Sequence, residues 1–227
     1  MKKNVSLLLA CIFTLSATAH ENTVQKSYQL TRVLPEYPFG WFGNEAQLRN
    51  LFETHNIRIV VEIGSWVGGG STRYMGNLLK RSQDRHVRRK KQNYKPALYA
   101  VDTWLGSLEH QPGQSAYDPI LPQLYEQFLS NMIHWNLTDV VVPCRMTSLE
   151  AARTLNVQPD LVYIDGDHST EAVYADLIAW YPIVKEHGIL CGDDWLWDSV
   201  RTAVEQFAAE NNLHVYASGN FWHLIPK

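Results

Sequence analysis

The stretch that decides the fold reads Ile57-Arg58-Ile59-Val60-Val61-Glu62-Ile63-Gly64-Ser65-Trp66-Val67-Gly68-Gly69-Gly70-Ser71-Thr72. Its first seven residues form a β-branched run that is typical of a strand buried in a parallel sheet. A glycine-rich turn follows, and helical spacing begins at Ser71. Such a turn lets backbone approach a ligand closely, and the helix N-terminus favours an anionic group. The spacing differs from the Gly-x-Gly-x-x-Gly pattern of nicotinamide-binding folds, so another ligand is expected.

Strand and helix patterns alternate through the rest of the chain. Apolar runs predict further strands at residues 98–101, 140–142, 160–164 and 189–192. Helical spacing predicts helices at residues 45–55, 71–82, 121–135, 148–155 (capped by Ser148), 171–184 (ended by His187-Gly188) and 199–211. The last two runs, 213–217 and 221–225, flank Ser218-Gly219-Asn220 and predict a hairpin. We therefore expect an α/β fold that is Rossmann-like and doubly wound, with a mostly parallel seven-stranded sheet and a C-terminal antiparallel β-hairpin.

The N-terminus has the pattern of a secretory signal peptide. Lys2 and Lys3 precede an apolar stretch, and Ala17-Thr18-Ala19 supplies small residues at a cleavage site. We expect a signal peptide at residues 1–19 and export to the periplasm or the medium, with no stable membrane span after cleavage. An uncleaved anchor or apolar tail is the alternative, and a cytoplasmic location follows if the segment is not a functional signal. Residues 20–56 are then an N-terminal cap segment that includes the aromatic stretch Tyr37–Phe42.

Composition narrows the class of protein. The 227 residues are 45% hydrophobic and 19% charged, which excludes global disorder. The net charge is −3, and it becomes −5 without residues 1–19 because 18 basic residues then face 23 acidic ones. A nucleic-acid partner is therefore not expected. The basic run Arg85–Lys91 is interpreted as a solvated surface loop, and Cys144 and Cys191 as buried free thiols.

Acidic residues stand at the ends of the first two predicted strands. Glu62 ends the first strand and can accept a hydrogen bond from an amine or a hydroxyl. Asp102 ends the second strand, where a carboxylate can hold both hydroxyls of a ribose. Trp104 could then pack on an adenine ring. The alternatives are that Asp102 caps a turn and that Trp104 belongs to the core.

Two further acidic groups follow neighbouring predicted strands. One is Asp165-Gly166-Asp167-His168 and the other is Asp193-Asp194. Carboxylates that converge at one sheet edge repel one another unless a cation neutralises them, and oxygen ligands select a hard divalent ion. His168 is well placed for a general base near neutral pH. The alternative is that these residues only cap loops and helices.

Together these motifs resemble class I S-adenosylmethionine-dependent methyltransferases over residues 57–227. The Glu62-Ile63-Gly64 turn resembles the first motif of that family, and Asp102 matches its ribose-binding acidic residue. The two acidic groups resemble the small-molecule O-methyltransferase branch that includes macrolide-sugar and cephalosporin-type enzymes and, more distantly, catechol-type enzymes. The Gly68-Gly69-Gly70 turn is one residue longer than in the catechol type, and the basic insertion is a second departure.

The resemblance implies a site and a reaction. The cofactor S-adenosyl-L-methionine would be held by Glu62, Gly64, Trp66, Gly68, Ser71, Asp102, Trp104, Thr147 and Asp165. A divalent cation, with Mg²⁺ favoured, would be bound by Asp165, Asp193 and Asp194, and His168 and Asp165 would be catalytic. The implied reaction is direct methyl transfer to a hydroxyl of a small-molecule acceptor. The sequence leaves the oligomeric state open, and a homo-oligomer is compatible with it.

The expected export conflicts with the cytosolic origin of this cofactor. The alternatives are an exported, non-catalytic binding protein of methyltransferase fold and a metal-dependent hydrolase that uses the same acidic residues. Glu62 and Asp102 favour adenosine binding over hydrolysis.

Overall fold

The computed structural model describes residues 28–30, 32–88, 95–114, 117–184 and 188–227. Three predictions fall at least partly outside these ranges. They are the signal peptide at residues 1–19, the end of the basic run at residues 89–91 and the helix end at His187. Within them, no helix is long and apolar enough to cross a membrane.

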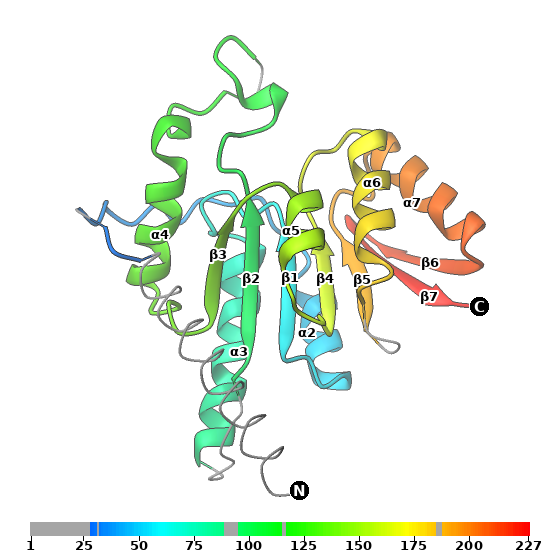
Figure 1. Ribbon diagram of the computed structural model, residues 1–227, viewed down its shortest axis with the longest axis horizontal. Helices are drawn as coiled ribbons and strands as arrows, with labels where there is room; N and C mark the ends of the chain where they lie inside the picture. The colour runs from blue at the N-terminus through cyan, green and yellow to red at the C-terminus, as the bar shows by residue number, and fades with distance from the viewer. Residues whose placement is uncertain (1–27, 31, 89–94, 115–116, 185–187) are drawn as a thin grey trace, which may run out of the picture.

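One seven-stranded sheet organises the fold, in the order β3-β2-β1-β4-β5-β7-β6 (Figure 1). The first five strands pair in parallel, and the last two join antiparallel at one edge. The strands are β1 (Ile59–Ile63), β2 (Ala97–Asp102), β3 (Val141–Arg145), β4 (Leu161–Ile164), β5 (Ile189–Gly192), β6 (Leu213–Ser218) and β7 (Phe221–Pro226). The predicted fold class is therefore confirmed, including the terminal hairpin.

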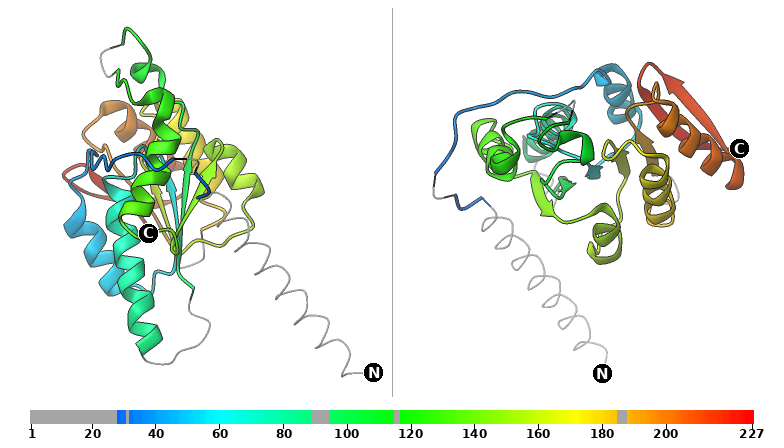
Figure 2. Two further views of the ribbon diagram at one scale, coloured as in Figure 1. Left: turned by 90° about the vertical axis from the view of Figure 1, so that its left-hand side faces the viewer. Right: turned by 90° about the horizontal axis from the view of Figure 1, so that it is seen from above.

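Helices cover both faces of the sheet (Figure 2). Alternate residues of β1 contact different layers, since Val60 packs in one buried cluster and Val61 in the other. The first layer holds α2 (Glu45–Thr54), α3 (Ser71–Arg88) and α4 (Leu124–His134), and the second holds α5 (Ser148–Thr154), α6 (Thr170–Trp180) and α7 (Asp198–Glu210). Two 3₁₀ turns, η1 (Leu108–His110) and η2 (Leu121–Gln123), lie between β2 and α4.

Helix boundaries differ from the predictions at several places; α4, for example, begins at Leu124, after the 3₁₀ turn η2. Helix α3 continues to Arg88, so the start of the basic run is helical and not a loop. Helix α6 ends at Trp180, because Pro182 has no amide to donate to Ile178. The N-cap of α5 is Thr147 and not Ser148, since the Thr147 hydroxyl accepts from the Glu150 amide.

The cap segment is attached to the main core by polar contacts. The amide and the carbonyl of Tyr37 both bond to the side chain of Asn131 in α4, at 3.0 and 2.8 Å. The segment then crosses the glycine-rich turn so closely that a Cβ on Gly69 would lie 1.9 Å from the Phe39 carbonyl oxygen. We predicted that these glycines admit a ligand; at Gly69 the structure shows that they admit the cap segment instead.

Candidate active site

A cavity of about 450 Å³ opens at the carboxyl ends of β1, β2 and β4. This is the edge at which open parallel sheets bind ligands. Of the predicted site residues, six line the cavity: Gly64, Trp66, Asp102, Thr147, Asp165 and His168. The lining also includes residues from the cap segment and from the connection between β2 and α4. Asp102 and Asp165, two of the acidic strand ends found in the sequence, thus border one cavity.

Gly64 brings the turns after β1 and β4 into contact. Its φ is +85°, and a Cβ there would lie 1.9 Å from the carbonyl oxygen of Asp165. The Gly64 amide donates to Val101 in β2, and the Asp165 amide donates to Ile63. Only glycine fits this position, so the turn around Gly64 fixes where Asp165 enters the cavity.

The Asp102 carboxylate links the end of β2 to the turn that follows β1. Its Oδ2 atom accepts hydrogen bonds of 2.9 Å from the amides of Ser65 and Trp66, and its Oδ1 atom accepts one of 2.7 Å from Trp104. Burial raises the pKa of the Asp102 carboxyl, and these amides partly offset that effect. The carboxylate therefore orders the glycine-rich turn and also borders the cavity, where its unused lone pairs can accept from a ligand hydroxyl.

Glu62 is fully buried beneath the turn and does not line the cavity. Its Oε2 atom accepts from the hydroxyls of Ser65 and Thr72, at 2.8 and 2.5 Å. Burial raises the pKa of Glu62 to about 7, although the Thr72 hydroxyl opposes the shift. Glu62 therefore supports the turn from within, and its contact with the cofactor stays a prediction.

Three other predicted cofactor contacts lie outside the cavity lining. Trp104 is 2% exposed and packs against Tyr125 and Phe128 in the core, which corrects the predicted stacking on adenine. Its indole Nε1 donates to the Trp66 carbonyl at 2.7 Å, so it supports the turn from below. The remaining two, Gly68 and Ser71, are likewise not among the lining residues.

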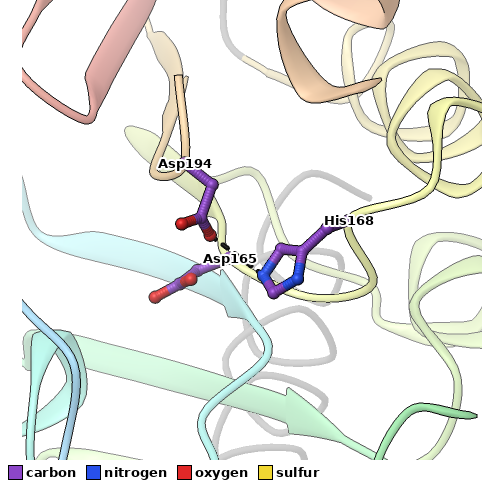
Figure 3. A group of neighbouring side chains, drawn as sticks. All are labelled: Asp165, His168 and Asp194. Carbon is purple, nitrogen blue, oxygen red and sulfur yellow. Dashed lines mark ion pairs between the residues drawn. The ribbon is translucent and has the colours of Figure 1, made fainter. Parts of the chain in front are cut away.

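Asp165, His168 and Asp194 point toward one another at the sheet edge (Figure 3). Each offers one ligand atom, and these atoms lie within 4.8 Å of one another. His168 Nε2 lies 3.0 Å from Asp194 Oδ2. Burial raises the pKa of Asp165 well above its usual range, and the nearby Asp193 and Asp194 carboxylates add to the shift. Such crowding of carboxylates beside an imidazole favours a bound cation.

Asp193 was predicted to bind the cation, but it is not in the group of possible ligands that the described residues form. Its carboxylate is buried and accepts from the Tyr163 hydroxyl at 3.1 Å and from the Asp194 amide at 2.8 Å. The Tyr163 hydroxyl in turn accepts from Asn44, which precedes α2. The group of possible ligands in the structure therefore contains His168 in place of Asp193.

The sequence did not single out several lining residues. Trp41 lies in the aromatic stretch of the cap segment, His110 lies in the connection between β2 and α4, and Asp176 is a polar residue in the middle of α6. The His110 ring packs on Trp66, with the centroids 4.6 Å apart. Asp102 and Asp165 were predicted because each stands at the end of a predicted strand. None of these three residues stands at a strand end, so the sequence offered no such pattern for them.

Comparison with known proteins identifies the class. A family model described as a methyltransferase domain matches residues 61–195, which include every predicted site residue. The chain therefore belongs to this methyltransferase family, and its fold is that of the class I S-adenosylmethionine-dependent enzymes.

Solved structures share this fold at low sequence identity. The O-methyltransferase TomG from Streptomyces achromogenes, involved in tomaymycin synthesis and solved with S-adenosylmethionine, is 13% identical over 90% of each chain, with a TM-score of 0.56. An O-methyltransferase from Bacillus cereus in complex with S-adenosylhomocysteine is 15% identical over 92% of this chain and 90% of its own, at 0.54. NovP, another O-methyltransferase, is 15% identical over 81% and 77%, at 0.56. A search of curated protein sequences gives no significant match.

Proposed function

We propose that the protein transfers a methyl group from S-adenosylmethionine to a hydroxyl of a small molecule, with the help of a divalent cation. The observation that carries the proposal is that Asp102 and the group of Asp165, His168 and Asp194 belong to one sheet edge beside one cavity. Similar folds occur in O-methyltransferases, some of them solved with this cofactor or its product. When bound, the cofactor supplies an electrophilic methyl group and the cation supplies a Lewis acid.

The residues of the first two strand ends fit the cofactor. Asp102 would accept hydrogen bonds from ribose hydroxyls while it holds the turn at Ser65 and Trp66. Trp66 and Thr147 border the same cavity and would confine the nucleoside. Gly64 keeps the turn after β1 in contact with the backbone of Asp165, so the nucleoside region and Asp165 border the same cavity.

The second group fits a cation and a proton acceptor. Two carboxylate oxygens, from Asp165 and Asp194, are ligands that Mg²⁺ or Mn²⁺ accepts. The His168 imidazole would take the proton of the acceptor hydroxyl, and Asp194, 3.0 Å from Nε2, would stabilise the imidazolium that forms. Positioning of the hydroxyl beside these groups, with water excluded, would supply most of the rate enhancement.

The location and the partners of the protein stay predictions. We propose that the chain is exported after cleavage near residue 19, that its partner is a small hydroxylated molecule and not a nucleic acid, and that it can form a homo-oligomer. Fractionation of cells that produce the full chain, with N-terminal sequencing of the product, tests export. Sedimentation of the purified protein tests its oligomeric state.

Calorimetric titration with S-adenosylhomocysteine, with and without Mg²⁺ or Mn²⁺, tests the proposed function. We expect binding that Asp102→Ala abolishes and that Asp198→Ala, a change at an 88% exposed carboxylate on α7, leaves intact. Absence of binding to both the cofactor and its product would overturn methyl transfer. Metal-dependent ester cleavage without the cofactor would instead favour the hydrolase alternative.

A further inference from the structure

Exposed apolar side chains gather around the mouth of the cavity. Among the described large apolar residues, the five most exposed are Leu108 at 79%, Leu196 at 67%, Trp41 at 65%, Leu105 at 63% and Ile178 at 53%. All but Ile178 belong to segments at the carboxyl edge of the sheet: the cap segment, the β2–α4 connection and the loop after β5. We use the name apolar rim for Trp41, Leu105, Leu108, Leu196 and Trp197.

One side of the apolar rim continues an aromatic wall of the cavity. Trp41 lines the cavity, lies edge-on to Phe39 at 4.5 Å and faces Trp66 at 6.4 Å between ring centroids. Trp66 in turn packs on His110. Leu105 and Leu108 bracket two lining residues, Gly106 and Ser107, in the connection that rises above the sheet edge (Figure 1).

The other side of the apolar rim adjoins the proposed proton acceptor. The Trp197 ring lies 4.7 Å from the His168 ring between centroids, and it is 48% exposed. Its amide donates to the carbonyl of Asp194 at 2.9 Å, which fixes the loop that carries the neighbouring Leu196. Apolar surface thus stands directly beside the polar group at which the acceptor hydroxyl would react.

We infer that the acceptor is amphipathic: it carries a hydroxyl beside a sizeable apolar or aromatic body that covers the apolar rim. This inference rests on the proposed function. The polar groups that fit the cofactor and the cation lie along the strand ends, so the apolar mouth is left for the acceptor. Exposed apolar surface concentrated around a cavity marks a binding site, since covering it releases ordered water. A free sugar would leave this surface uncovered.

A series of 4-alkylcatechols, from methyl to hexyl, tests the inference. The vicinal hydroxyls stay constant while the apolar body grows, so chain length isolates the contribution of the rim. Binding is measured by calorimetry on the full chain with Mg²⁺, both with and without S-adenosylhomocysteine. We expect affinity to rise about threefold for each added methylene, as for partial burial of an alkyl chain.

Two variants identify where the alkyl chain of the ligand binds. The double change Leu108→Ser with Leu196→Ser should remove most of the dependence on chain length. Ile178→Ser is the matched control, because Ile178 is a similarly exposed apolar residue on α6 that borders a different hollow, beside Tyr174 and Phe207. It should leave the dependence unchanged.

The outcomes separate this inference from the proposed function. Affinity that does not rise with chain length, or that rises equally in the double variant, overturns the amphipathic acceptor even when S-adenosylhomocysteine binds. Absence of binding to both S-adenosylmethionine and S-adenosylhomocysteine overturns methyl transfer, while the alkylcatechol series without cofactor still measures the contribution of the apolar rim. Retention on phosphatidylcholine vesicles that the double variant loses would assign the rim to a lipid surface and overturn the acceptor.

Discussion

His168 Nε2 lies 3.0 Å from Asp194 Oδ2, although the two residues follow different strands. His168 comes from the turn after β4, and Asp194 comes from the turn after β5. The backbone of Asp194 has a φ of +60°, a conformation that non-glycine residues rarely adopt. It is held there by the hydrogen bond between its amide and the Asp193 carboxylate. Local strain of this kind often accompanies a functional site, and here it directs Asp194 toward the imidazole.

Asp194→Asn should separate chemistry from cofactor binding. The neutral amide cannot stabilise an imidazolium or bind a cation as the carboxylate does, so turnover should fall about a hundredfold or more. Affinity for S-adenosylhomocysteine should change little, because Asp102 and the glycine-rich turn are untouched. Steady-state kinetics on a turned-over acceptor, with calorimetry for the product, make the comparison. Asp198→Asn is the control, and undiminished turnover of Asp194→Asn would contradict the assigned role.

Asp102→Asn should weaken cofactor binding and loosen the turn. The amide group that replaces one carboxylate oxygen presents hydrogens to backbone amides, so at least one of the three hydrogen bonds is lost. We expect affinity for S-adenosylhomocysteine to fall at least about tenfold, and the free energy of unfolding to fall by about 1–3 kcal/mol. Calorimetry and urea denaturation measure the two effects. A destabilised variant with wild-type affinity would show that Asp102 orders the turn without influence on the ligand.

Glu62→Gln should change how stability depends on pH. Because burial raises the pKa of Glu62 to about 7, from an ordinary value of 4.5, the folded state holds this proton more tightly than the unfolded state does. The resulting stabilisation is complete below pH 4.5 and is lost as pH rises through 7. Glutamine stays neutral. As pH rises across this interval, the free energy of unfolding of the variant should therefore increase by about 3 kcal/mol relative to that of the wild type.

Urea denaturation at several pH values between 4.5 and 8 measures this difference. Glu205→Gln, at an exposed position on α7, is the control for removal of a carboxylate. A constant difference between wild type and Glu62→Gln across the interval would mean that Glu62 carries no raised pKa.

The mostly parallel seven-stranded sheet and the edge that carries the site could be predicted from the sequence. Continuous β-branched runs such as Ile57–Ile63 specify strands buried on both faces, and the residues after them must lie at one edge. Asp102, Asp165 and His168 were found in this way. Helix boundaries were less predictable, since α3 extends to Arg88 and not only to the expected residue 82.

Side-chain direction at the site depends on contacts between distant segments. Asp193 was expected to bind a cation, but its orientation depends on Tyr163 in β4, which itself contacts Asn44 before α2. Trp104 follows a strand end as Asp102 does, yet its φ of +52° accompanies a ring buried in the core. Neither arrangement has a local pattern in the sequence.

The close crossing of the cap segment over the glycine-rich turn gives a prediction about Gly69. In Gly69→Ala the new methyl group would lie 1.9 Å from the Phe39 carbonyl oxygen, so the cap segment must move away. We expect the free energy of unfolding to fall by about 3 kcal/mol, as in severe overpacking. Gly43→Ala is the matched control, because nothing lies within 4 Å of a Cβ there, and it should change stability by less than about 0.5 kcal/mol. Urea denaturation compares the two variants, and equal stabilities would mean that the cap segment does not rest on the turn in solution. Since Trp41 belongs to the displaced segment, Gly69→Ala should also weaken the dependence of alkylcatechol binding on chain length, which Gly43→Ala should preserve.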